Sequence, residues 1–299
     1  MLDFKKLTME DIEIVRPYFE MSRSNNCDNT VGGSVMWADF FDTHYTIKEK
    51  TLVFKVRFLD KGECFTVPIG ESVGYALDLI CEYCRENSIP MQFVTVTDRD
   101  LAVLEQKYSV EKTLLSDWSD YVYNAEDLIN LTGRKYHGQK NHINFFKKTY
   151  PNYVFEEINE DNIEEVKEFI IEFSKNESKD SILFEEELKK TKEVLDNNDR
   201  YKFFGVMLKV DGKISAFSMG ERVKHTLFAH IEKADKTKRG AYPMIMNEFA
   251  KRFGQDMHYI NREENAGDKG LESSKLQYHP CTILNKYYVK VNCKRCEEK

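Results

Sequence analysis

The stretch "NREENAGDKGLESSKLQYHP" (residues 261–280) holds the densest group of side chains able to do chemistry. It follows an apolar run that predicts a strand, and ligands of such sheets bind at strand ends. A carboxylate of Glu263 or Glu264 would orient an attacking amine or take its proton, and Tyr278 would protonate a leaving oxygen. Lys275 would stabilise a developing oxyanion or a phosphate. The sequence predicts these four residues as catalytic, with substrate contacts from Asn261, Arg262, Asp268 and His279.

The same stretch also has a plain structural interpretation. Asn-Ala-Gly-Asp-Lys-Gly is ordinary turn chemistry, and Asp268 would cap a helix over 269–277. The sequence contains no Ser-His-Asp set, Walker loop or HExxH motif. A reaction here would therefore proceed by direct attack of an acceptor, aided by electrostatics, without a covalent enzyme intermediate.

A second candidate, "KADKTKRGAY" (233–242), leads into a predicted helix. Positive charge beside a helix start favours an anionic ligand, although a charged surface turn is the alternative. The coenzyme A loop of acetyltransferases reads Gln/Arg-x-x-Gly-x-Gly/Ala, and here Thr237 and Tyr242 occupy its flanking positions. This departure from the pattern weakens the case for coenzyme A as the donor and favours a tRNA-carried or other phosphorylated donor. The residues assigned to the carrier are Lys236, Lys238, Arg239 and Gly240.

A third candidate is the stretch 128–155, which has no carboxylate in a chain of formal net charge −7. Basic side chains without acids suit phosphate contacts and counterion release, so an RNA acceptor end would fit. A solvated helix face, with lysines paired to acids elsewhere, is the alternative. His137 and His142 are five residues apart and do not share a helix face, so no metal pair is predicted there. The residues assigned to the carrier are Arg134, Lys140, Lys147 and Lys148.

The seven cysteines suggest reduced thiols and not a disulfide framework. Cys81/Cys84 and Cys293/Cys296 form two CxxC pairs, which together would suffice for a zinc site. The pairs lie far apart in the chain, and the first falls within helical apolar spacing. We therefore expect free thiols and no metal.

The composition, 41% hydrophobic and 32% charged, indicates packed cores and a soluble surface. No apolar run approaches the roughly 18 residues of a spanning helix, and the start lacks a signal-peptide core. We expect a cytoplasmic protein of two domains.

The elements that would position these residues occur twice. Residues 7–19 align with 158–170, residues 51–70 with 201–220, and residues 74–96 with 241–261. The offset grows from about 150 to about 166 residues, which indicates an extra strand and basic loop over 223–240 in the second half only. Residues 51–70 and 201–220 each predict a β-hairpin. Residues 74–96 and 241–261 each predict a helix followed by a strand.

This order of helices and strands matches the acetyltransferase-like (GNAT) plan, an α+β fold. In that fold a strand, loop and helix start present backbone N–H groups to a phosphate-bearing ligand. We expect two tandem GNAT-like domains: a degenerate one over 1–130, and one over 131–299 that carries the site behind a basic joining helix.

Residues 261–280, 123–151 and "VMWADFFDTHYTI" (35–47) resemble the family defined by the C-terminal domain of phosphatidylglycerol lysyltransferases. More distantly, the chain is similar to Fem-type peptidoglycan aminoacyltransferases, which are also tandem GNAT proteins. The resemblance implies transfer of an aminoacyl group from a charged tRNA to an amine or hydroxyl. The membrane portion of those lysyltransferases has no counterpart here, so an acceptor other than membrane lipid is expected.

Three functions stay open. The first is an aminoacyltransferase whose donor is aminoacyl-tRNA. The second is a coenzyme A-dependent N-acyltransferase whose donor is an acyl-CoA. The third is a non-catalytic module that binds tRNA or another anion.

Overall fold

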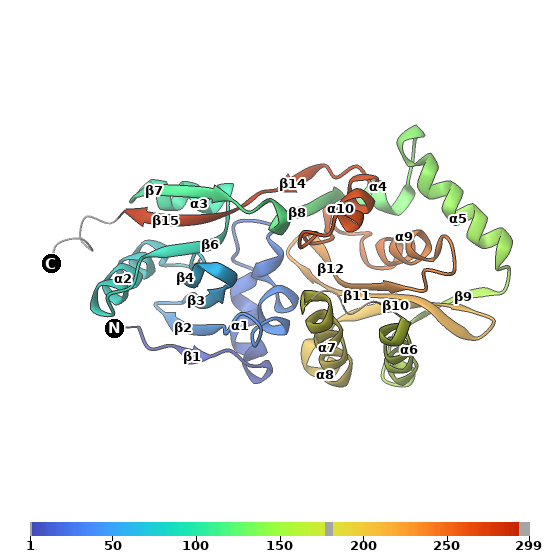
Figure 1. The fold of residues 1–299 in the computed structure, drawn as a ribbon, viewed down its shortest axis with the longest axis horizontal. Coiled ribbons are helices and arrows are strands. Elements are labelled where there is room, and N and C mark those ends of the chain that lie inside the picture. Colours follow the sequence, from blue (N-terminus) through green and yellow to red (C-terminus); the bar gives the residue numbers. More distant parts are fainter. Residues whose placement is uncertain (1, 177–181, 293–299) are drawn as a thin grey trace. The chain divides into compact units, whose positions relative to one another are not determined.

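The computed structural model describes residues 2–176 and 182–292. The chain forms two compact units, each built on its own mixed sheet with helices on it (Figure 1). Unit 1 comprises the described residues of Met1–Asp120 and Leu284–Lys299, and unit 2 comprises those of Tyr121–Ile283. The predicted α+β architecture is confirmed.

Unit 1 has an eight-stranded sheet of order β1-β2-β3-β4-β6-β15-β7, with β5 paired to β3. Only β4 and β6 run parallel, and they pair at Phe65 and Phe93. Its strands are β1 (Lys5–Lys6), β2 (His44–Lys48), β3 (Thr51–Phe58), β4 (Gly62–Phe65), β5 (Ile69–Gly70), β6 (Gln92–Thr97), β7 (Ser109–Leu114) and β15 (Lys286–Asn292). Its helices are α1 (Ile12–Phe19), α2 (Val73–Glu86) and α3 (Asp98–Glu105), with short turns η1 (Met9–Asp11), η2 (Cys27–Asn29), η3 (Gly32–Met36), η4 (Leu59–Lys61) and η5 (Ser116–Trp118).

Helix α2 shows why the first CxxC pair is structural. Apolar residues recur every three or four positions along it, which buries one face against the sheet. Cys81 and Cys84 lie on that face and are buried. Cys293 and Cys296 lie outside the described residues.

Unit 2 has a seven-stranded sheet of order β14-β8-β13-β12-β11-β10-β9. Its strands are β8 (Asp120–Asn124), β9 (Tyr153–Glu157), β10 (Phe204–Val210), β11 (Lys213–Val223), β12 (Thr226–Ala234), β13 (Tyr259–Asn261) and β14 (Thr282–Leu284). Its helices are α4 (Ala125–Asn130), α5 (His137–Thr149), α6 (Ile163–Asn176), α7 (Ile182–Asp196), α8 (Asn198–Tyr201), α9 (Ala241–Phe253) and α10 (Lys269–Leu276), with the turn η6 (Arg134–Tyr136).

The sheet of unit 2 is covered on both faces. Helices α9 and α10 lie on one face, and α6 and α7 lie on the other (Figure 1). Helix α9 contributes Met244, Ile245 and Phe249 to the main core, and Phe146 of α5 joins the same core. A charged side chain inside a sheet covered in this way needs a buried partner.

The predicted repeat is present, but its strands correspond differently from the sequence alignment. The parallel pair is β4 with β6 in unit 1 and β12 with β13 in unit 2. Hairpin β3–β4 therefore corresponds to β11–β12, and not to β10–β11 as the alignment predicted. β2 then corresponds to β10, so 223–240 is no extra strand. The alignment slipped by one strand because its matched glycines, Gly62 and Gly212, both occupy hairpin turns at positive φ.

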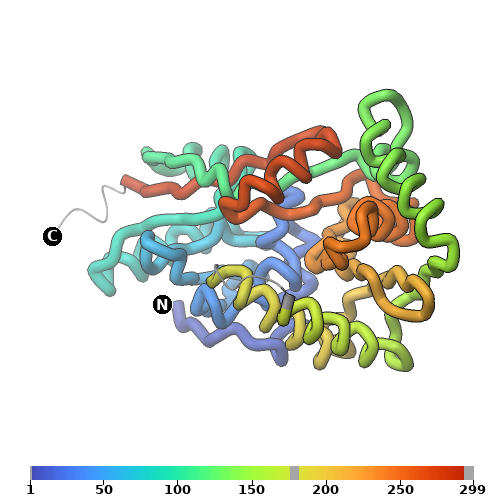
Figure 2. The backbone as a smooth tube through the Cα atoms, turned by 45° about the vertical axis from the view of Figure 1, so that its right-hand side comes forward, coloured from blue at the N-terminus to red at the C-terminus, as the bar shows by residue number. Residues whose placement is uncertain are grey.

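One strand from each half of the chain pairs within the sheet of the other unit. The boundary between the units therefore differs from the predicted one. Strand β8 follows unit 1 in the chain but pairs with β13, whereas the last strand, β15, pairs with β6 and β7 (Figure 2). Helix α4 is held in unit 2 as well, because Asn247 donates hydrogen bonds to the carbonyls of Leu128 and Ile129. The boundary thus falls at 120/121 where the sequence predicted 130/131, and the C-terminal strand of the predicted second domain belongs to unit 1.

Candidate functional site

The site forms where the two parallel strands of unit 2 separate. β12 and β13 pair from Thr226 with Tyr259 to Phe228 with Asn261, and the pairing ends there. At the same level the register between β11 and β12 shifts, which leaves His230 as the extra residue of a β-bulge. Gly220 permits this bulge, because a Cβ at that position would lie 1.8 Å from the carbonyl oxygen of Phe228.

His230 lies between two carboxylates. Its Nδ1 is 2.6 Å from Oε1 of Glu263, and its Nε2 is 3.0 Å from Oε1 of Glu221. Its side chain is only 1% exposed. Burial opposes the charged imidazole, but the charge of Glu263 and hydrogen bonds to both carboxylates raise the His230 pKa to about 10. His230 is therefore a fixed cation that connects β11, β12 and the end of β13.

A second ion pair joins β12 to the segment after β13. Nη2 of Arg262 is 2.8 Å from Oε1 of Glu232, and the guanidinium lies 4.9 Å from the ring centre of Tyr278. Burial opposes its charge, but Glu232 keeps the pKa of Arg262 above its usual value. Although the side chain is only 8% exposed, Nε and Nη1 have no hydrogen-bond partner within the described chain. These two N–H groups are therefore buried and unsatisfied, and the guanidinium lies beside the rings of Tyr123 and Tyr278.

Lys275 holds the loop after β13 in place. Its Nζ donates to the carbonyl oxygens of Arg262 at 2.5 Å and Glu263 at 3.1 Å, and also to that of Glu264. Burial lowers the pKa of Lys275. Because three carbonyls take its three N–H donors, we assign Lys275 a positioning role in place of the predicted oxyanion role.

Hydrogen bonds hold Glu263, a residue of the same loop, at its backbone N–H, its backbone carbonyl and one carboxylate oxygen. Its N–H donates to Oδ1 of Asn261 at 2.7 Å, and its carbonyl accepts from Tyr121 and Lys275. Its φ of 59° is left-handed, a conformation that non-glycine residues adopt where the surroundings enforce it. Within the described chain, no hydrogen bond or ion pair reaches its second carboxylate oxygen, Oε2, and the side chain is 20% exposed.

The other predicted residues of this stretch have mixed placements. Asp268 caps α10 by accepting from the N–H groups of Gly270 and Leu271, which confirms the structural interpretation of that residue. His279 lies apart from the ion pairs, where its Nε2 is 3.0 Å from the carbonyl of Lys135. Glu264 is half-buried, and Asn261 is fully buried in β13. Tyr278 is buried against Arg262, and burial raises its pKa, so it is a poor proton donor.

The basic loop before α9 packs on α5. Gly240 has a φ of 96°, and a Cβ there would lie 2.5 Å from the carbonyl oxygen of His142. Lys238 forms an ion pair with Asp235, whereas Lys236 is exposed. Arg239 lies over the ring of Phe145 at 4.9 Å. The loop is therefore built against α5, and Arg239 is its outward cation.

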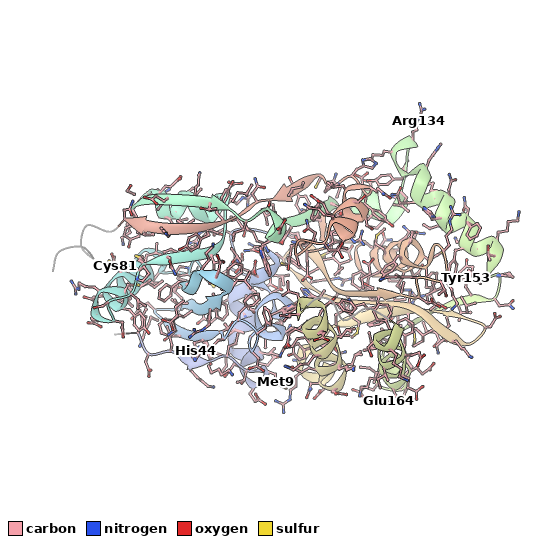
Figure 3. All side chains as sticks on the ribbon, viewed as in Figure 1. Met9, His44, Cys81, Arg134, Tyr153 and Glu164 are labelled. Atoms are coloured by element: carbon pink, nitrogen blue, oxygen red, sulfur yellow. The ribbon has the colours of Figure 1, made fainter. Side chains whose placement is uncertain are left out.

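Helix α5 presents its basic side chains to solvent. It buries Gln139, Ile143 and Phe146, and the labelled Arg134 at its start points away from unit 2 (Figure 3). The exposed cations without a carboxylate partner among the described residues are Arg134, Lys140, Lys147 and Lys148. The predicted pairing of these lysines with distant acids does not occur there.

Sequence reasoning missed His230, Glu221 and Glu232. Each is a polar residue inside a strand of a sheet covered on both faces; Glu221 and His230 are buried, and Glu232 is partly buried. The sequence does contain a signal of these residues. In "LFAHIEKA" (227–234), the polar His230 and Glu232 interrupt a run of apolar residues. Within the described residues, no helix has the length and apolar character needed to cross a membrane.

The chain is similar to solved proteins over nearly its whole length. A protein of unknown function from Bacteroides thetaiotaomicron shares 31% identity, with a TM-score of 0.88 over 98% of this chain and 100% of that chain. The match to L-PGS from Bacillus licheniformis (13% identity, TM-score 0.66) covers 96% of this chain and 93% of the L-PGS chain. The match to FemX (9% identity, TM-score 0.59) covers 96% of this chain and 97% of the FemX chain. These structures confirm the tandem GNAT-like fold.

Among curated proteins, the uncharacterised MYCGA3080 of Mycoplasmoides gallisepticum is 23% identical over 203 residues. That match covers 66% of this chain and 64% of the relative, so the chain spans less than two thirds of the relative's length. The family model "Phosphatidylglycerol lysyltransferase, C-terminal" matches residues 19–290. The chain therefore belongs to the phosphatidylglycerol lysyltransferase C-terminal family.

Proposed function

We propose that this protein transfers an aminoacyl group from a tRNA to an amine or hydroxyl acceptor, and that Glu263 receives the acceptor's proton. The observation that carries the proposal is the carboxylate of Glu263. Its Oε1 is bound to the imidazolium of His230, its backbone is fixed, and only Oε2 is left for a substrate. A preorganised carboxylate with one open oxygen suits proton acceptance.

The reaction needs one bond made and one broken. The acceptor's N–H or O–H donates to Oε2 of Glu263, and its nitrogen or oxygen attacks the carbonyl carbon of the aminoacyl ester. The bond from that carbon to the ribose oxygen breaks. The proton moves to Oε2 and then to the departing ribose oxygen. Arg262 would supply fixed positive charge beside Glu263, and Lys275 would keep the loop in place.

The donor is inferred from charge. Two ion pairs, His230–Glu263 and Arg262–Glu232, bridge the separating strands, so an uncharged pantetheine arm would meet charged groups there. The outward face of α5 instead carries cations that are not neutralised. Cations of this kind bind phosphates and release counterions. A tRNA carrier fits these features better than coenzyme A, and it would place the reaction in the cytoplasm.

The test is transfer of a radiolabelled amino acid from tRNA to acceptors. Small primary amines and vesicles containing phosphatidylglycerol would be offered in parallel. We expect Glu263→Gln to lower the transfer rate by at least about 100-fold, the usual contribution of a general base. Glu272→Gln, at a surface carboxylate paired with Lys269, is the matched control and should leave the rate unchanged.

One observation favours a second function. The loop at Gly240 still leads into α9 as a coenzyme A loop would. Stabilisation by an acyl-CoA without any effect of charged tRNA would support that N-acyltransferase and refute our proposal. Full activity of Glu263→Gln would refute the role of that carboxylate.

A further inference from the structure

The outward face of α5 carries an exposed aromatic ring beneath an exposed guanidinium. Phe145 is 42% exposed, in a helix whose buried face is formed by Gln139, Ile143 and Phe146. The Cζ atom of Arg239 lies 4.9 Å from the centre of its ring. Neither residue belongs to the core, so the fold does not need this pair.

The pair is held in place from the loop side. Asp235 accepts from the N–H and the hydroxyl of Thr237 and forms an ion pair with Lys238. Gly240 then brings the loop into direct contact with the backbone of α5 at His142. Arg239 lies between these two fixed points, so its guanidinium is presented over Phe145 at small entropic cost.

The surroundings of the pair are cationic. Lys148 lies three residues after Phe145 and so on the same helix face. Arg239, Lys147 and Lys148 have no carboxylate partner within the described chain. The nearest acids to α5 along the sequence are Asp127 and Glu156, outside the helix at both ends, and Asp235, the acid nearest to Arg239 in the loop, is paired with Lys238. A polyanion can approach the ring without repulsion.

We infer that Phe145 and Arg239 form a stacking platform for an unpaired nucleobase at the single-stranded end of the RNA, while the neighbouring lysines bind its phosphates. This inference rests on the proposed function. Aromatic rings and planar guanidinium groups are what unpaired bases stack on, and bases inside a duplex cannot reach them. The platform would thereby favour an RNA with a free single-stranded end over a blunt duplex.

A membrane surface fits the same face less well. An interfacial helix needs a wide apolar face, whereas Phe145 is accompanied on the outward side by Asn141, Asn144 and Lys148. One ring among amides and amines suits one stacked base. Binding to anionic vesicles is nevertheless one outcome of the test below.

The experiment measures fluorescence anisotropy with two RNA probes over a range of salt and, in parallel, co-sedimentation with vesicles that contain phosphatidylglycerol. One probe is an unstructured single strand of about eight nucleotides, within the usual site size of such platforms. The other is a blunt duplex with the same number of phosphates. The variants are Phe145→Ala, Phe145→Tyr and Lys147→Gln/Lys148→Gln. Tyr75→Ala, at a ring of 51% exposure on α2 of unit 1, is the matched control.

We expect Phe145→Ala to weaken single-strand binding about 10-fold without changing its salt dependence, because stacking involves no counterion release. Duplex binding should not change, and Phe145→Tyr should retain the wild-type affinity. Lys147→Gln/Lys148→Gln should weaken binding of both probes. For the single strand, the slope of log affinity against log salt should fall by about 1.4, because each phosphate that a lysine no longer neutralises removes roughly 0.7 from it.

Three results would overturn the platform. Unchanged single-strand affinity in Phe145→Ala would do so, and so would an equal decrease in affinity for both probes. Vesicle binding abolished in Phe145→Ala, with RNA binding intact, would assign the ring to a membrane. If the double lysine variant also binds RNA normally, the proposed carrier itself is refuted, which separates the two failures.

Discussion

The buried charge of His230 makes the stability of this protein fall as the pH rises. The imidazole pKa is raised from 6.5 to about 10 in the folded chain. A raised pKa means that its contribution is complete below pH 6.5 and disappears as the pH approaches 10. Each pH unit is equivalent to about 1.4 kcal/mol. Between pH 7 and 9, the stabilisation that His230 gives the folded state should therefore fall by about 2–3 kcal/mol.

The assay is urea unfolding followed by far-ultraviolet circular dichroism at several pH values. Wild type is compared with Glu221→Gln/His230→Gln, which removes the cation together with its more deeply buried carboxylate partner. Tyrosines, lysines and cysteines titrate in both proteins, so only the difference between the two pH dependences reports on His230. NMR of the imidazole protons gives a second measurement, because the His230 signal should not titrate below about pH 9. Equal pH dependences in the two proteins would refute the reasoning.

Three further predictions concern residues whose contacts are fixed by the structure. Lys275→Met should lower the free energy of unfolding by about 3 kcal/mol, because three carbonyls lose their donor; unchanged stability with abolished transfer would restore a catalytic role. Gly240→Ala should cost about 2 kcal/mol in urea unfolding, and the control Gly212→Ala less, since no atom lies within 4 Å of its added Cβ. Lys286→Met should destabilise unit 1 by about 3–5 kcal/mol, because the fully buried carboxylate of Asp120, 2.6 Å from Lys286, is left without that partner. Adding Asp120→Asn should recover part of that stability in the tryptophan-fluorescence transition.

The local elements were predictable because they depend on short-range rules. The helix cap at Asp268, the turn glycine at Gly240 and the exposed basic face of α5 each follow from neighbours in the chain. Strand pairing was not predictable in the same way. Every hairpin shows the same alternation, so the sequence could not decide between β10–β11 and β11–β12 as the partner of β3–β4. The exchange of β8 and β15 is a long-range choice with no local signal.

The site was predictable in part for the same reason. Arg262 and Glu263 lie in one loop, Lys275 lies in the helix that follows it, and the sequence placed all three in one stretch. Their partners His230 and Glu232 come from β12, which reaches them only across the parallel pair. The role of Lys275 was misjudged because its acceptors are backbone carbonyls, which every residue has and no sequence pattern displays.

A comparison of the two units bears on why unit 2 contains the ion pairs of His230 and Arg262. Both sheets contain a parallel pair whose strands separate after a few residues. In unit 1 the pair meets at Phe65 and Phe93, both wholly buried; Val94 follows on β6, and Val67 follows just beyond the end of β4. The fold is thus stable with apolar residues at this place. Buried ion pairs are no more stabilising than apolar packing of the same volume. Unit 2 nevertheless keeps two of them there, one on His230 and one on Arg262, and we propose that they are kept for the binding of a polar substrate.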